Sequence, residues 1–146
     1  MRIQLVCLGN ICRSPMAEVV LRHRLLTAGR DDVEVESTGI GSWHIGELMD
    51  PRARQALKER GYDGTAHRAR QFDDDHLAQA DLILAMDRSN LAALRRKAPG
   101  DERIRLFGSY LTDEPEVPDP YYDGGFDRAL DLIEAATAKL VAALKV

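Results

Sequence analysis

Cys7 and Arg13 stand near the N-terminus with five residues between them, inside the run VCLGNICRSP at positions 6–15. A thiolate is a strong nucleophile, and the planar guanidinium of an arginine binds two phosphate oxygens at once. Brought together, the two side chains would attack a bound phosphate ester at its phosphorus atom. The spacing alone is weak support, because a chain with 2 Cys and 16 Arg among 146 residues contains such a pair by chance in roughly one case in five.

The residues around this pair strengthen the prediction. The apolar run that ends at Cys7 predicts a buried strand, and Ser14-Pro15 predicts the start of a helix. Between them, Gly9 and Asn10 are residue types that adopt left-handed backbone conformations, in which successive N–H groups point at one anion. The helix N-terminus adds further N–H groups and a partial positive charge. We therefore predict a phosphate-binding loop after the first strand; the alternative is a buried structural cysteine beside a surface arginine.

A phosphate ester also needs a general acid for its leaving group, and such an acid belongs on a loop near the same place. The best candidate is Asp119, in the run PDPYY at positions 118–122. The flanking prolines favour an extended backbone, and Tyr121 and Tyr122 are suited to the wall of a slot for a flat substrate. The alternative is an ordinary Asp-Pro turn with two exposed aromatic side chains.

The elements that must position these residues alternate along the chain. Short apolar runs predict β-strands at 3–7, 33–38, 81–86 and 103–107. Helical spacing follows each strand, at about 14–28, 50–60, 72–79, 87–97 and 126–144. This order predicts an α/β fold, a doubly wound sheet of about four parallel strands flanked by helices. Ligands bind beyond the carboxyl ends of such strands, where Cys7 lies. Asp87 also falls at this edge, but we interpret it as a helix cap.

Composition narrows the function classes. The length fits a single domain, residues 1–146, and the net charge of −4 argues against a general nucleic-acid binder. No apolar stretch is long enough to span a bilayer, and the start has no signal-peptide pattern. Two cysteines form no secreted disulfide framework and no zinc motif, so we expect a cytoplasmic protein without a metal. His23, His44 and His76 show no ligand spacing and are predicted to be structural or solvated.

Six blocks of this sequence together resemble the low-molecular-weight protein tyrosine phosphatase family. Besides positions 6–15 they are STG at 37–39, WHIG at 43–46, HRARQ at 67–71, MDRSN at 86–90 and DPYY at 119–122. They occur in the family's order across nearly the whole chain. The segment DGGF at 123–126 is shorter and richer in glycine than in many relatives, which affects the rim of the substrate site rather than the chemistry.

The resemblance implies a catalytic trio and an aromatic slot. Cys7 is the nucleophile, Arg13 binds the phosphate and the transition state, and Asp119 acts as general acid and then as base for the attacking water. No cofactor and no metal is used. The aromatic side chains that line the slot are those of Trp43, Tyr121 and Tyr122.

The resemblance also implies roles for the phosphate-binding loop, whose other members are Leu8, Gly9, Asn10, Ile11 and Cys12. Ser14 donates a hydrogen bond to the sulfur of Cys7 and eases its departure. Asn10, Ser37 and His67 form the hydrogen-bond network that holds the loop in a strained shape. Cys12 forms a reversible disulfide with Cys7.

The function that follows is a protein-tyrosine phosphatase that acts on tyrosine-phosphorylated proteins through a cysteinyl-phosphate intermediate. It needs neither nucleic acid nor membrane insertion, and we expect a monomer, with weak self-association as the alternative. An arsenate reductase on this scaffold requires two further cysteines downstream, and no cysteine follows Cys12. A protein-arginine phosphatase tends to carry Thr at the position of Ile11. A non-enzymatic phosphate-binding module needs neither a thiolate nor an acid.

Overall fold

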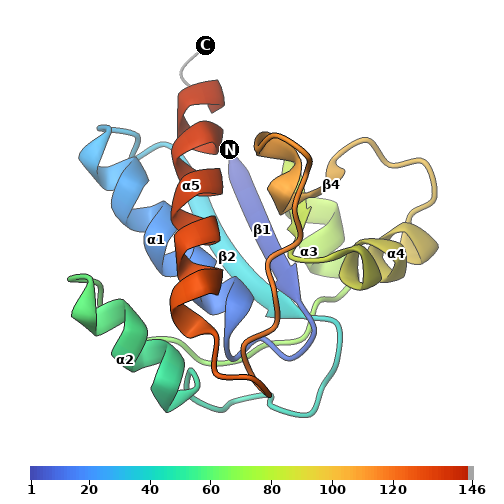
Figure 1. The fold of residues 1–146 in the computed structure, drawn as a ribbon. Helices are drawn as coiled ribbons and strands as arrows, with labels where there is room; N and C mark the ends of the chain where they lie inside the picture. Colours follow the sequence, from blue (N-terminus) through green and yellow to red (C-terminus); the bar gives the residue numbers. More distant parts are fainter. Residues whose placement is uncertain (145–146) are drawn as a thin grey trace.

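The computed structural model describes residues 1–144 and contains one sheet of four parallel strands in the order β2-β1-β3-β4 (Figure 1). The strands are β1 (Arg2–Cys7), β2 (Glu34–Gly39), β3 (Leu82–Ala85) and β4 (Ile104–Leu106). The helices are α1 (Arg13–Thr27), α2 (Pro51–Glu59), α3 (Asp74–Gln79), α4 (Arg88–Lys97), the short 3-10 helix η1 (Phe107–Tyr110) and α5 (Phe126–Leu144). The predicted α/β class and the flanked parallel sheet are confirmed.

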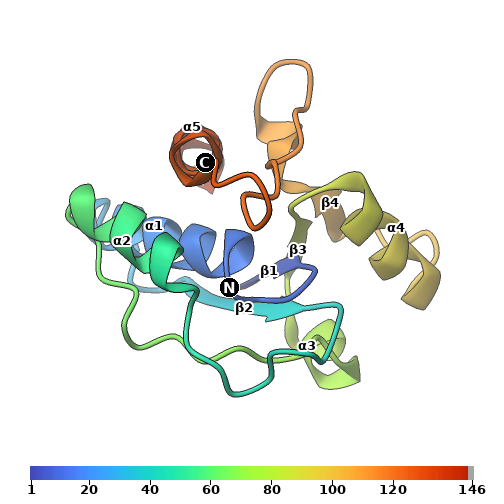
Figure 2. The ribbon, with the colours of Figure 1, turned by 60° about the horizontal axis from the view of Figure 1, so that its bottom comes forward.

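The central strand β1 is buried on both faces, as its apolar sequence predicted. Ile3, Leu5 and Cys7 point into the larger core, which they share with α1 and α5. Val6 points into a second core on the opposite face, beside α4 and Phe72. Figure 2 shows the two layers, with α1 and α5 on one side of the sheet and α3 on the other. Side chains alternate along a strand, so successive residues of β1 serve different layers.

Most element boundaries differ from the prediction by one or two residues, and two of these differences have a clear structural reason. Helix α1 begins at Arg13 rather than at Ser14, because the loop after β1 turns directly into the first helical turn at Cys12. Strand β4 ends at Leu106, because the backbone turns into η1 and buries Phe107 in the larger core that includes α5. Among residues 1–144, no helix combines the length and the apolar character that crossing a membrane demands.

Candidate active site

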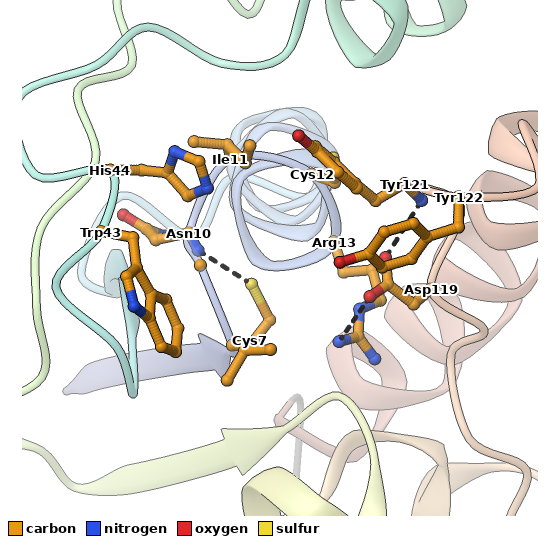
Figure 3. A pocket seen from close by; sticks show the side chains of 12 residues that line it. Cys7, Asn10, Ile11, Cys12, Arg13, Trp43, His44, Asp119, Tyr121 and Tyr122 are labelled. Carbon is orange, nitrogen blue, oxygen red and sulfur yellow. Dashed lines mark hydrogen bonds and ion pairs between the residues drawn. The ribbon is translucent and has the colours of Figure 1, made fainter.

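Cys7 ends β1 at the carboxyl edge of the sheet and lies at the base of a cavity of about 410 Å³ (Figure 3). Residues 8–12, which we call the phosphate loop, join β1 to α1. The N–H of Asn10 donates to the Cys7 sulfur at 3.3 Å, and the Ser14 hydroxyl oxygen lies 3.0 Å from the same atom. Both groups lie within hydrogen-bond distance of the sulfur, and the backbone N–H of Asn10 is a donor to it.

Asn10 holds the phosphate loop in shape. Its backbone is left-handed, with φ of 58°, and its side-chain amide donates to the hydroxyls of Ser14 at 2.9 Å and Ser37 at 3.0 Å. The amide oxygen of Asn10 accepts from the backbone N–H of Arg70 at 2.8 Å, and Nε2 of His67 lies 2.7 Å from the Asn10 carbonyl oxygen. The structure therefore brings together the three residues of the expected network. Residues other than glycine rarely adopt this backbone conformation, so these hydrogen bonds must offset the strain in the Asn10 backbone.

The backbone conformation of Gly9 differs from the sequence prediction. Only Asn10 of the pair has a left-handed backbone, and the expectation for Gly9 was wrong. The space around Gly9 explains the residue instead, because a Cβ atom there would lie 3.0 Å from Cδ2 of His44. Gly9 thus allows His44 to approach the phosphate loop.

Arg13 is 3% exposed and is fixed by partners distant in sequence. Its Nη1 donates to the carboxylate of Asp87 at 2.6 Å and to the carbonyl of Val117 at 3.1 Å, while Nη2 lies 3.8 Å from the carboxylate of Asp119. Burial opposes the charge of the guanidinium, but the negative charges of Cys7, Asp87 and Asp119 outweigh it and raise the pKa of Arg13. Arg13 is therefore a permanently charged donor with a fixed orientation.

Asp87 and His44 are the two site residues that the sequence reasoning missed. Asp87 caps α4 as predicted, accepting from the N–H of Asn90 at 2.7 Å, but its second carboxylate oxygen holds Arg13. Its place directly after β3, at the same sheet edge as Cys7, was the available signal. His44 was predicted to be structural or solvated; it lines the cavity and pairs through Nδ1 with Glu47. Its position next to Trp43 was the signal.

The walls of the cavity come from two loops (Figure 3). Trp43 and His44, on the loop after β2, stand on one side of Cys7, and Tyr121 and Tyr122 stand on the other. Trp43 and Tyr122 are 69% and 90% exposed, so both rings are free to stack on a flat ligand. The phosphate loop supplies further lining residues, including Leu8, Gly9, Ile11 and Cys12. Ser14, Ser37 and His67 stand behind the loop and do not line the cavity.

Asp119 lies on the segment 117–125 before α5, which we call the acid loop. Its carboxylate accepts a hydrogen bond from the N–H of Tyr121 at 3.1 Å. The same carboxylate faces the guanidinium of Arg13, and both side chains line the cavity. The side chain is 38% exposed, so its carboxyl group is in contact with solvent. A carboxyl group at the mouth and a sulfur at the base are the two ends that an in-line displacement at phosphorus requires.

Cys12 and Cys7 are both buried and both free. Burial, followed by the negative charges of Asp50, Cys7 and Asp119, raises the pKa of the Cys12 thiol. The Cys12 thiol is therefore protonated at neutral pH. Within residues 1–144, no group of three or more His, Cys, Asp and Glu side chains is placed to hold a metal ion.

Comparisons with known proteins match this chain along nearly its whole length. The family described as low molecular weight phosphotyrosine protein phosphatase matches residues 2–146. A low molecular weight protein-tyrosine-phosphatase from Streptomyces coelicolor is 46% identical over 99% of this chain and 93% of its own length. The crystal structure of YfkJ from Bacillus subtilis aligns with a TM-score of 0.94 at 35% identity, covering 99% of this chain and 94% of that one. A Drosophila arginine phosphatase aligns with a TM-score of 0.90 at 34% identity, covering 100% and 99% of the two chains.

Proposed function

The chain belongs to the low molecular weight phosphotyrosine protein phosphatase family, and from this premise we propose that it hydrolyses phosphotyrosine in proteins through a cysteinyl-phosphate intermediate. The observation that carries the proposal is the convergence of Cys7, Arg13 and Asp119 on one cavity. The cavity also has aromatic walls that suit the ring of a phosphotyrosine. We take residues 1–146 as one catalytic domain, since both cores pack against a single sheet.

In the first step, the Cys7 thiolate attacks phosphorus and the bond from phosphorus to the tyrosine oxygen breaks. Asp119 gives its proton to that departing oxygen. The phosphate loop N–H groups and the guanidinium of Arg13 bind the equatorial oxygens, whose charge they are already oriented to stabilise. The product of this step is tyrosine and a phosphate bonded to the Cys7 sulfur.

In the second step, the Asp119 carboxylate takes a proton from a water molecule, which attacks phosphorus. The sulfur–phosphorus bond breaks and inorganic phosphate leaves. The Ser14 hydroxyl, 3.0 Å from the sulfur, donates to the thiolate as it departs. Ser14 therefore assists the second step more than the first.

Asp119→Ala is expected to lower kcat/KM by about 10²-fold for phenyl phosphate and much less for p-nitrophenyl phosphate. A general acid contributes ~10²–10⁴-fold, and it matters most for a leaving group that departs poorly as an anion. Steady-state rates across a series of substituted phenyl phosphates measure this. An equal loss for every leaving group would remove Asp119 from the acid role.

The substrate profile tests the function itself. Trp43, Tyr121 and Tyr122 stand at the cavity mouth above Cys7, and a phosphotyrosine ring extends its phosphorus further from the peptide backbone than phosphoserine does. We expect turnover of phosphotyrosine peptides and p-nitrophenyl phosphate, and little turnover of phosphoserine peptides. Trp43→Ala is expected to lower kcat/KM for aryl phosphates about tenfold, since aromatic stacking adds ~0.5–1.5 kcal/mol to the burial of the ring. Comparable turnover of phosphoserine would contradict the proposal.

A protein-arginine phosphatase is the second candidate, because a Drosophila arginine phosphatase shares this fold at 34% identity. Ile11 lines the cavity with an apolar side chain, which suits an aromatic ring better than a guanidinium. The two functions predict different results for phosphoarginine peptides. Preference for phosphoarginine over phosphotyrosine, improved further in Ile11→Thr, would favour this second candidate.

Redox sensitivity follows from the two buried thiols. Peroxide is expected to oxidise Cys7 to a sulfenic acid, which the Cys12 thiol traps as a disulfide before further oxidation. After peroxide treatment, a thiol reductant should restore activity to the parent protein and much less to Cys12→Ser. Equal recovery of the two proteins would show that Cys12 gives no protection. The requirement for a reduced Cys7 suits a reducing compartment such as the cytoplasm.

A further inference from the structure

The N-terminus of α2 contacts both loops that form the cavity. On one side, the backbone N–H of Asp50 donates to the carbonyl oxygen of Ile11 in the phosphate loop at 2.9 Å. On the other side, the guanidinium carbon of Arg52 lies 5.4 Å from the ring centre of Tyr121 and 4.9 Å from that of Phe126. Tyr121 belongs to the acid loop, and Phe126 begins α5 directly after it. Asp50, which caps α2, and Arg52 therefore join the phosphate loop to the acid loop.

The guanidinium of Arg52 is held in a fixed plane. Its Nε donates to one carboxylate oxygen of Asp50 at 3.2 Å, and its Nη2 donates to the other at 3.0 Å. Asp50 is 8% exposed and also caps α2 by accepting from the backbone N–H of Arg52 at 2.8 Å. Burial opposes the negative charge of Asp50, but these hydrogen bonds lower the pKa of its carboxyl group. The charged pair is thus present at neutral pH, with a planar cation facing two aromatic rings.

The acid loop is also attached near its start, and Asp119 within it pairs with Arg13 at 3.8 Å. Val117 donates through its N–H to the carbonyl oxygen of Met86 at 2.9 Å and accepts from Arg13. Asp119 lies between Val117 and Tyr121, and its carboxylate accepts a hydrogen bond from the backbone N–H of Tyr121. Fixing both ends of the segment 117–121 limits where the Asp119 carboxyl group can reach.

We propose that Arg52 is a positioning residue for the general acid: by holding Tyr121, it keeps the Asp119 carboxyl group over the cavity. The proposal rests on the proposed function, in which Asp119 protonates the leaving oxygen. Arg52 itself does not line the cavity, so its effect reaches the reaction through Tyr121 and Asp119.

The test uses Arg52→Met, which keeps most of the side-chain length but removes the charge and the planar group. We expect kcat/KM to fall about tenfold for phenyl phosphate and less than about threefold for p-nitrophenyl phosphate, because only a poor leaving group needs the proton. Arg52→Lys keeps the charge, and its kcat/KM for phenyl phosphate is expected to lie between those of the parent and Arg52→Met. The matched control is Arg54→Met on the same helix, since Arg54 lines a different hollow with Lys58 and Tyr62; its profile should match the parent.

A second measurement places Arg52→Met in the Asp119→Ala background. If Arg52 acts through Asp119, the double variant should match Asp119→Ala for every leaving group. A further tenfold loss in the double variant, or an equal loss across leaving groups in Arg52→Met alone, would overturn the proposal and indicate a role in binding or stability. A parent protein that hydrolysed no aryl phosphate would contradict the proposed function. An active parent with an unaltered leaving-group profile in Arg52→Met would contradict only the role of Arg52.

Discussion

Cys7→Ser is expected to abolish turnover, by at least roughly 10⁴-fold, while the fold and phosphate binding remain. Serine occupies nearly the same volume, and the N–H of Asn10, the hydroxyl of Ser14 and the guanidinium of Arg13 still surround the position. A hydroxyl group in this setting stays protonated, because no general base contacts it to remove the proton. The phosphate site is kept and the nucleophile is lost.

Three measurements check this expectation. Steady-state kinetics with p-nitrophenyl phosphate give the loss in kcat, thermal unfolding reports the fold, and calorimetric titration with inorganic phosphate reports binding. Rapid-quench trapping in the parent should find the phosphoryl group on Cys7. Cys12→Ser is the control, with near-parental turnover in reductant. A phosphoenzyme on any other residue would contradict the assignment.

Arg13→Lys is expected to lower kcat/KM on the order of 10³-fold despite the conserved charge. Removing a single oriented donor from an oxyanion site costs ~10²–10³-fold, and a lysine supplies one point charge in place of two parallel donors. The ammonium group also cannot hold Asp87 and Val117 while facing the phosphate, as the guanidinium of Arg13 does. The buried end of Asp87 then loses its partner, so the melting temperature should fall as well.

Arg128→Lys, an exposed substitution on α5, is the control for this experiment and should leave both quantities unchanged. The kinetic measurement is kcat/KM with p-nitrophenyl phosphate, together with inhibition by inorganic phosphate, which should weaken. An Arg13→Lys protein within tenfold of the parent would show that charge alone is sufficient. That result would leave the role of Cys7 intact.

The sheet and its helices could be read from the sequence because β1 and β3 are almost wholly apolar and the helices between them are periodic. The end of β4 could not be predicted from the sequence, since the burial of Phe107 in the core beside α5 depends on tertiary packing. The same holds for the site. Local sequence identified Cys7 and the loop after it, but the pairing of Arg13 with Asp87 joins residues that only the folded sheet brings together.

His44 illustrates a second limit. Nothing in the residue type separates a histidine that lines a cavity from one on an open surface, and the difference here is the missing side chain of Gly9. Gly9 itself was interpreted through backbone freedom, whereas the structure assigns it to close approach. Residue type therefore predicted a turn of the chain after β1 but gave the wrong physical reason for Gly9.

The two contacts that orient Arg13 span 74 and 104 positions along the chain, to Asp87 and to Val117. A nascent chain that has emerged only as far as β4 already carries the nucleophile and the phosphate loop, yet neither Val117 nor Asp119. On the proposed mechanism, such a chain has the nucleophile but lacks the proton donor. On that mechanism, catalytic competence therefore requires the segment that follows β4. In a refolding experiment, we expect recovery of activity to report these long-range contacts and recovery of helical signal to report local structure.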